Sequence, residues 1–143
     1  MRHRPTIVVL AAGQGSRFAA ASSAAAHKLE QGLGESTVLG TTLGHVIATA
    51  CPFVVVTTAR LVPLASTLVA RCDLVVISDD EARRGVGHSI AAGVAERPMA
   101  TGWLVLPGDM PMISSASILA VAEALAEHQV AFSQYHGRRG HPV

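Results

Sequence analysis

The residues best suited to chemistry form a glycine-rich turn near the amino end of the chain. Residues 6–10 are an apolar, β-branched run typical of a buried strand, and Gly13 and Gly15 follow it. Glycine has no Cβ, so the backbone of such a turn can approach a ligand closely. A group of N–H donors exposed there binds anions, most often phosphate. Arg17 and Lys28 would add two positive charges. The segment is therefore a candidate phosphate site, with a simple tight turn as the alternative.

The turn differs from two common phosphate-binding motifs. Phe18 stands where the dinucleotide-binding fingerprint needs a third glycine. A P-loop would require Gly-Lys-Ser or Gly-Lys-Thr at a fixed distance, and the sequence has neither there. The kind of ligand must therefore be inferred from the other motifs.

A carboxylate follows a second apolar run. The sequence Leu106-Pro-Gly-Asp-Met-Pro111 places Asp109 just after residues 103–106, which are typical of a buried strand. Packing explains a carboxylate at that position poorly, whereas Mg²⁺ prefers carboxylate oxygens and usually also contacts the phosphates of a substrate. Asp109 is therefore predicted to bind Mg²⁺, and capping of a turn is the alternative.

Two further motifs contain paired glycines. Gly85 and Gly87 lead into a predicted helix, so Ser89 near its start could bond a base or ribose, or simply cap the helix. Gly93 within that helix costs stability relative to alanine and is predicted to allow close packing against a sheet. Residues 135–143 contain two arginines, two glycines and two histidines. They are interpreted as a solvated basic tail, with contact to the phosphate of a second substrate as the alternative.

Short apolar runs alternate with longer segments of helical period, which predicts an α/β fold. Near-continuous Val, Ile and Leu runs are typical of parallel strands buried on both faces, and the alternation implies right-handed crossovers. We expect a three-layer α/β/α sandwich with a mostly parallel sheet. The predicted strands are residues 6–10, 53–58, 74–78, 103–106, with Pro111 stopping the strand, and 130–135. The predicted helices are residues 37–50, 61–71, 86–96 and 114–128, the last capped by Ser114 or Ser115.

Ligands of open α/β sheets bind beyond the carboxyl ends of the strands. The glycine-rich and polar residues of this chain concentrate in the segments that follow the predicted strands. These segments are residues 13–28, 57–60, 78–89, 107–111 and 136–143.

Composition excludes several classes of protein. The 143 residues are 50% hydrophobic and 15% charged, which fits one folded domain and argues against disorder. A net charge of +1 and 3% aromatic residues argue against nucleic acid and membrane as partners. No apolar stretch is long enough to span a bilayer. Cys51 and Cys72 form no C-x-x-C pair, so we expect free thiols in the cytoplasm.

Four motifs, taken together and in order, resemble the MobA-like nucleotidyltransferases, and most closely their molybdenum cofactor cytidylyltransferase branch. The resemblance covers nearly the whole chain, whereas the first motif alone is shared with sugar-nucleotide pyrophosphorylases and other cytidylyltransferases. The motifs are residues 10–18 with Lys28, residues 85–90, residues 106–111 and residues 137–142.

The resemblance implies a Rossmann-like nucleotidyltransferase fold and a Mg²⁺-dependent enzyme. Such an enzyme moves a nucleoside monophosphate from an NTP onto a phosphate-bearing acceptor, here one such as molybdopterin cofactor, and releases pyrophosphate. Ala12 favours CTP over GTP, because guanylyl-transferring relatives tend to have glycine there. A client molybdoenzyme is a further implied partner.

The resemblance also implies a role for each matching residue. Arg17, Lys28 and Asp109 are the implied catalytic residues, with Lys28 at the α-phosphate and Asp109 on Mg²⁺. The backbone of Gly13, Gly15, Ser16 and Arg17 would hold the triphosphate. The base and ribose pocket would be lined by Ala11, Ala12, Gly87 and Ser89.

The chain departs from the family pattern at several points. Ala19 replaces a usual glycine, Val86 replaces a usual methionine, and the segment between Arg17 and Lys28 is long. The pattern also continues beyond Gly-His-Pro-Val with a segment that supplies a second metal ligand. We therefore expect one domain, residues 1–143, that lacks this segment, binds nucleotide, turns over weakly and leaves apolar surface uncovered. A non-catalytic nucleotide-binding module and a nucleotidyltransferase for a sugar or alcohol phosphate are the alternatives.

Overall fold

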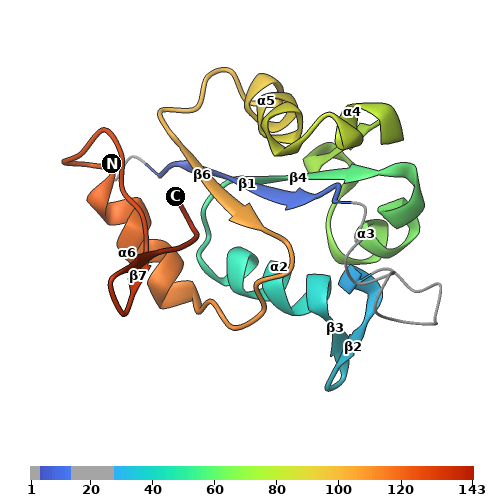
Figure 1. Ribbon diagram of the computed structural model, residues 1–143, viewed down its shortest axis with the longest axis horizontal. Coiled ribbons are helices and arrows are strands. Elements are labelled where there is room, and N and C mark those ends of the chain that lie inside the picture. The colour runs from blue at the N-terminus through green and yellow to red at the C-terminus, as the bar shows by residue number, and fades with distance from the viewer. Residues whose placement is uncertain (1–3, 14–27) are drawn as a thin grey trace.

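The computed structural model, which describes residues 4–13 and 28–143, is built around a sheet of four parallel strands (Figure 1). Their spatial order is β5-β4-β1-β6. This order puts β1 in the middle, with β4 and β6 pairing on its two sides. The strands are β1 (Thr6–Ala11), β4 (Phe53–Thr58), β5 (Leu74–Ile77) and β6 (Trp103–Pro107). The predicted α/β fold with a mostly parallel sheet is confirmed.

Both faces of the sheet are covered, which explains why its strands are continuous apolar runs. Successive side chains of a strand point to opposite faces. In β1, Ile7 and Val9 therefore belong to one apolar core and Val8 to another, and all three are fully buried. The first core is the larger, since it also receives side chains from three helices.

Helices form the outer two layers (Figure 1). One face of the sheet carries α2 (Val38–Ala48), α3 (Val62–Leu68) and α6 (Ser115–Ala124). The other carries α4 (Asp79–Arg83) and α5 (Val86–Glu96). The shorter elements are η1 (Lys28–Glu30), β2 (Gly32–Leu33), β3 (Ser36–Thr37), η2 (Ala59–Leu61), η3 (Arg71–Asp73), β7 (Gln134–Tyr135) and β8 (Arg138–Arg139).

Side-chain caps mark where α6 and α2 begin, and a glycine marks where α5 begins. Ser114 accepts a hydrogen bond from the backbone N–H of Ser117, so the predicted capping serine of α6 is Ser114. Thr37 caps α2 in the same way. Gly85 precedes α5 with φ of 119°, a backbone conformation that residues with a side chain rarely adopt.

One strand prediction is wrong, and another strand is one residue longer than predicted. The run 130–135 contributes only its last two residues to β7, which pairs with β8 rather than with the central sheet. Its earlier part bonds locally to the chain end, since Ser133 donates to the carbonyl of Pro142 and accepts from Gly140. The β6 strand ends at Pro107, one residue after its predicted end at Leu106, so it stops before Pro111 is reached.

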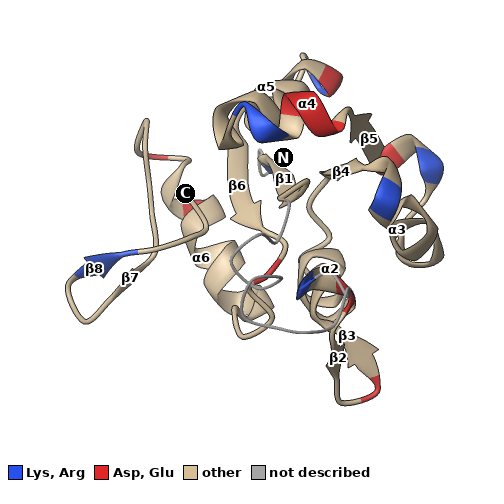
Figure 2. Ribbon diagram, turned by 45° about the vertical axis from the view of Figure 1, so that its right-hand side comes forward, with Lys and Arg blue, Asp and Glu red and all other residues tan. Residues whose placement is uncertain are grey.

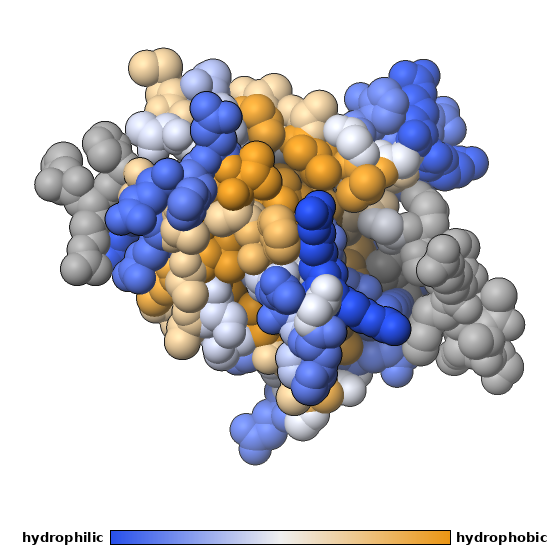
Figure 3. All heavy atoms as spheres, turned by 60° about the vertical axis from the view of Figure 1, so that its left-hand side comes forward, coloured by the Kyte–Doolittle hydropathy of each residue, from blue (hydrophilic) through white to orange (hydrophobic). Residues whose placement is uncertain are grey.

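Charged and apolar side chains are unevenly distributed over the surface. Figure 2 shows acidic residues on α4 and basic residues on β8, which projects from the body of the molecule. Figure 3 shows apolar side chains gathered in the middle of the face that lies to the left in Figure 1. Toward the chain end, large apolar side chains with marked exposure are Val130, Phe132 and Val143. Across residues 4–13 and 28–143, no helix combines the length and apolar character needed to cross a membrane.

Candidate functional site

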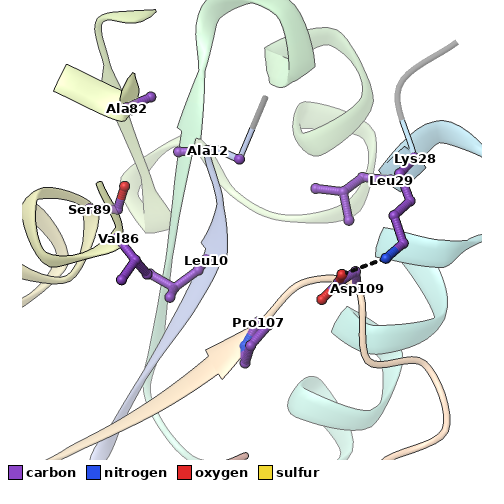
Figure 4. Close-up of a pocket in the computed structure, with 10 residues that line it drawn as sticks. Leu10, Ala12, Lys28, Leu29, Ala82, Val86, Ser89, Pro107 and Asp109 are labelled. Atoms are coloured by element: carbon purple, nitrogen blue, oxygen red, sulfur yellow. Dashed lines mark hydrogen bonds and ion pairs between the residues drawn. The ribbon is translucent and has the colours of Figure 1, made fainter. Parts of the chain in front are cut away.

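A pocket opens at the carboxyl ends of β1 and β6. These strands lie side by side, but the chain reaches β6 only after passing through β4 and β5 on the other side of β1. Such a reversal of strand order leaves a crevice in which open α/β sheets bind ligands. The pocket has a volume of about 260 Å³ (Figure 4). Its lining residues are Leu10, Ala12, Gly13, Lys28, Leu29, Ala82, Val86, Ser89, Pro107 and Asp109.

An ion pair lies on one side of the pocket. The Nζ of Lys28 donates to Oδ2 of Asp109 at 2.9 Å, and the two side chains are 48% and 38% exposed (Figure 4). Both groups therefore remain accessible to a ligand in the pocket. An ammonium and a carboxylate side by side can bind the two components of a metal–phosphate complex, because one attracts phosphate oxygens and the other attracts the cation.

Lys28 is positioned by the short helix that it begins. The next residue, Leu29, is 5% exposed and inserts into the same core as Leu39 and Leu43 of α2. This anchor fixes η1 against α2, so the flexible Lys28 side chain starts from a fixed backbone position. The lysine reaches Asp109 from the side of α2, across from the strand end that carries the carboxylate (Figure 4).

Asp109 is positioned by the glycine before it. The N–H of Gly108 donates to the carbonyl of Leu10 at 2.8 Å, which extends the pairing of β6 with β1 past the strand end. A Cβ on Gly108 would lie 3.0 Å from that same oxygen and 3.0 Å from Cδ1 of Leu39. A side chain at position 108 would therefore push against its neighbours, and the close approach places Asp109 beside the end of β1.

The opposite side of the pocket is apolar apart from one hydroxyl. Ser89 of α5 is 5% exposed, and its oxygen lies among the side chains drawn around the pocket (Figure 4). One turn later, a Cβ on Gly93 would meet Cγ1 of Val8 at 2.5 Å, so α5 packs more closely on β1 than any larger residue would allow. The predicted close packing at Gly93 is confirmed. An apolar slot with a single hydroxyl suits the flat face of a base or the edge of a sugar.

The acidic helix α4 supplies another part of the wall. The helix lies within residues 78–89, one of the segments that follow a predicted strand, and Ala82 lines the pocket. The helix starts with a capping box, in which Ser78 accepts from the N–H of Glu81 and the Glu81 carboxylate accepts from the N–H of Ser78. The backbone N–H of Ser78, the largest cause, lowers the pKa of Glu81 below its ordinary value.

The structure brings together five of the residues singled out by sequence and separates others from them. Ala12, Gly13, Lys28, Ser89 and Asp109 line the one pocket. The side chain of Ala11 is instead fully buried in the core shared with α2. Gly87 is exposed at the start of α5 and is not part of the lining. Gly15, Ser16 and Arg17 lie outside the described residues.

Sequence reasoning did not single out several lining residues. Pro107, Ala82 and Val86 lie in segments that follow strands, so the carboxyl-end rule contained the signal for them. Leu10 is the penultimate residue of β1, and Leu29 was hidden because no motif identified the short helix η1. Two of the selected segments, residues 57–60 and 136–143, contribute no lining residue.

The carboxylate in the pocket fits a metal that is shared with a substrate. Within residues 4–13 and 28–143, no three His, Cys, Asp or Glu side chains are grouped so that they could hold a metal ion. Mg²⁺ does not need such a group, because it retains several waters and is often bound through one or two carboxylates and the phosphates of the substrate. Asp109, partly exposed and 2.9 Å from a cation, has the chemistry for this kind of binding.

Solved structures share this fold. Rv0371c from Mycobacterium tuberculosis H37Rv matches with a TM-score of 0.80 and 24% identity, over 99% of this chain and 71% of that chain. A manganese complex of Rv0371c matches with a TM-score of 0.75 and 24% identity, over 97% and 68% of the two chains.

Two nucleotide-transferring enzymes also match. A nucleotidyl transferase from Methanothermobacter thermautotroptrophicus is 30% identical, with a TM-score of 0.66, over 84% of this chain and 57% of that chain. A cytidylyltransferase from Leptospira borgpetersenii is 18% identical, with a TM-score of 0.57, over 87% and 50%. At 18% identity the likeness shows the fold alone. None of the curated proteins compared with the chain matches it.

The family itself is identified from the sequence. The profile of the MobA-like NTP transferase domain matches residues 7–143, which include every lining residue of the pocket. The pocket lies where open α/β sheets bind their ligands, and it combines a cation, a carboxylate and an apolar slot. This chain therefore belongs to the MobA-like NTP transferase domain family and is a nucleotidyltransferase domain.

Proposed function

We propose that this chain transfers a nucleoside monophosphate, with CMP from CTP preferred, onto a phosphate-bearing acceptor such as molybdopterin cofactor. The observation that carries the proposal is the pocket at the ends of β1 and β6, in which Lys28 and Asp109 lie 2.9 Å apart. An oxygen of the acceptor phosphate attacks the α-phosphorus, a new P–O bond forms, and the bond to the bridging oxygen breaks as pyrophosphate leaves.

The protein contributes positioning and charge to this reaction. Catalysis of phosphoryl transfer rests mostly on alignment of the reactants and stabilisation of negative charge. We assign Lys28 to the α-phosphate, where its ammonium offsets the charge that develops as pyrophosphate departs. We assign Gly13, Gly15, Ser16 and Arg17 to the triphosphate, the last three from the sequence motif.

Asp109 would hold the divalent cation. When bound, Mg²⁺ neutralises charge on the triphosphate and orients it for in-line attack. A solved structure of Rv0371c, which has the same fold, is a manganese complex, and a divalent cation at Asp109 agrees with that. Because Lys28 pairs with Asp109, the cation and the triphosphate would exchange this ion pair for two new ones, metal with carboxylate and ammonium with phosphate.

The nucleoside would occupy the apolar side of the pocket. Ala12 and Ser89 face it together with Val86, and a base there would be covered on one side by α5. The preference for CTP is supported by Ala12, through the resemblance of the sequence motifs to molybdenum cofactor cytidylyltransferases. We propose Ala11 and Gly87 as backbone contributors only, since neither lines the pocket.

Titration of the purified chain with each of the four NTPs, with and without Mg²⁺, tests the proposal. We expect Mg²⁺-dependent binding with CTP tighter than GTP, and pyrophosphate release when an acceptor is added. Binding without pyrophosphate release from any phosphate-bearing acceptor would instead identify a nucleotide-binding module. Release with a sugar or alcohol phosphate alone would reassign the acceptor. Absence of binding by all four NTPs would reject the proposed function.

A further inference from the structure

Thr57 places a buried hydroxyl group directly after three buried valines of β4. It follows Val54, Val55 and Val56 in β4, and like them it is fully buried. Threonine and valine have nearly the same shape, so packing alone would be satisfied by a fourth valine. A buried hydroxyl costs stability unless it is hydrogen-bonded. The Oγ1 of Thr57 donates to the carbonyl oxygen of Ala11 at 3.0 Å.

The acceptor of this bond is the last residue of β1. Ala11 pairs with Thr57 in the register of the sheet, and the next two residues, Ala12 and Gly13, line the pocket. The Thr57 bond therefore holds the backbone at the point where β1 ends and the glycine-rich turn begins.

A second hydrogen bond holds the same strand end from the other side. The N–H of Gly108 donates to the carbonyl of Leu10 at 2.8 Å, and Asp109 is the next residue along the chain. Neighbouring carbonyls of β1 are thus tied to β4 by a side chain and to β6 by the main chain. The two bonds together set where the start of the turn lies relative to the Asp109 carboxylate.

We propose that Thr57 is a positioning residue for the nucleotide: its hydroxyl fixes the end of β1 so that Ala12 and Gly13 meet the nucleotide beside Asp109. The inference rests on the proposed function, which it deepens. Thr57 does not line the pocket and acts through Ala11. A small displacement of groups that orient a substrate is costly, so the loss of one such bond should appear in ligand affinity.

A purely structural role for Thr57 makes a different prediction. Loss of a buried hydrogen bond would then lower the stability of the fold but leave ligand affinity in the folded protein unchanged. Thr42 offers a matched control, because it is 1% exposed and its Oγ1 donates to the carbonyl of Val38 at 3.0 Å within α2. The change Thr42→Val removes the same kind of bond from a helix that carries no lining residue of the pocket.

The experiment compares Thr57→Val, Thr57→Ser and Thr42→Val with the wild-type chain. Calorimetric titration measures binding of CTP and of inorganic pyrophosphate with Mg²⁺, and denaturant unfolding measures stability. We expect Thr57→Val to weaken both ligands by about tenfold, Thr57→Ser to restore wild-type affinity, and Thr42→Val to leave affinity unchanged. Hydrogen exchange of the Ala12 and Gly13 amides in the ligand-free protein should be faster in Thr57→Val only.

The outcomes separate the inference from the proposed function. Wild-type affinity in folded Thr57→Val, with a stability loss like that of Thr42→Val, overturns the inference and leaves the proposed function intact. Failure of the wild-type chain to bind any NTP rejects the proposed function, and the inference falls with it. If Thr57→Val does not fold, Thr57→Ala removes the same hydroxyl with a smaller side chain, and its affinity decides the question in the same way.

Discussion

Lys28 and Asp109 form an ion pair of 2.9 Å although 81 positions separate them in the sequence. Neither residue is buried, so the pair contributes little to folding, about 1 kcal/mol at most. Because the pair lies at the edge of the pocket, its role is in ligand binding rather than in stability. The pair places the two groups that a metal–triphosphate complex needs within reach of one ligand.

Removing either partner should therefore affect ligand binding far more than stability. We expect Lys28→Ala to weaken Mg²⁺–CTP binding by about tenfold to hundredfold, the range for hydrogen bonds to charged groups. Asp109→Asn should abolish the Mg²⁺ dependence. Calorimetric titration with and without Mg²⁺ measures both effects. The matched control is Asp73→Asn, which breaks the 3.1 Å ion pair with Arg97 away from the pocket and should leave affinity unchanged. Persistence of the full Mg²⁺ dependence in Asp109→Asn would remove the metal assignment.

The hydroxyl of Ser89 should contribute to nucleotide affinity. Ser89→Ala deletes one oxygen from an otherwise apolar side of the pocket, and the loss of one neutral hydrogen bond weakens binding by about threefold to tenfold. Fluorescence titration of the wild-type chain and of Ser89→Ala with CTP measures this difference in affinity. Ser115→Ala serves as the comparison, because Ser115 donates to the carbonyl of His45 at 2.9 Å at the start of α6. It should lower stability without changing affinity, and equal affinity in both variants would exclude Ser89 from the nucleotide site.

A side chain at position 108 should destabilise the fold. A Cβ there would lie 3.0 Å from both the Leu10 carbonyl and Leu39, so Gly108→Ala should cost about 1–3 kcal/mol as an overpacking change. It should also displace Asp109 and weaken Mg²⁺ binding. Gly102→Ala is the control just before the other end of β6, where the nearest atom is Pro5 Cβ at 3.8 Å. Chemical denaturation and Mn²⁺ titration of the two variants provide the comparison, and equal behaviour would contradict the close approach.

Two helix glycines should respond in opposite directions to alanine. Gly93→Ala places a Cβ 2.5 Å from Val8 and 3.0 Å from Val56, so we expect a loss of about 1–3 kcal/mol in the free energy of unfolding. In Gly44→Ala the new Cβ meets nothing within 4 Å, and the higher helix propensity of alanine should stabilise α2 by about 0.8–1.0 kcal/mol. Urea denaturation measures both values. Stabilisation by Gly93→Ala would contradict the packing of α5 on the sheet.

The capping box of α4 should make the fold sensitive to acid. The folded pKa of Glu81 is lowered from its ordinary value of 4.5, chiefly by the Ser78 N–H, so its contribution is fully present above that value. It is lost as the pH falls through the lowered folded pKa. Glu81→Gln keeps a capping-box side chain without the titration. We expect the wild-type melting temperature to fall more steeply below pH 4.5 than that of the variant. Parallel curves would remove the role assigned to the carboxylate.

Much of the central sheet could be predicted from the sequence. Strand β4 and helix α5 have their predicted bounds, because each coincides with one uninterrupted pattern between clear breaks. Helix α4 was not predicted, since its five residues include a single apolar one, Ala82, and only the Ser78–Glu81 pair signals the start. The run 130–135 looked like a sheet strand because hydropathy does not specify which partner a strand will find.

The pocket was predicted in part for a similar reason. The carboxyl-end rule depends on topology alone, so it identified the segments of Ser89 and Asp109 correctly. The rule cannot say which face a residue presents, and Ala11 points into the core while Ala12 points to the other face. The Lys28–Asp109 contact depends on η1, which is held by the buried side chain of Leu29 and by the ion pair of Glu30 with Arg60. No sequence pattern of that length specifies a tertiary contact.

The missing methyl group at position 93 has a consequence for how this chain selects its ligand. Gly93 lets α5 settle against Val8, and Ser89 lies one turn away on the same buried side of that helix. The width of the pocket between α5 and β1 is thus set by Gly93, which packs against the sheet and does not line the pocket. Variants that accept a bulkier base should therefore arise by substitution of Gly93, as well as by substitution of the residues that line the pocket.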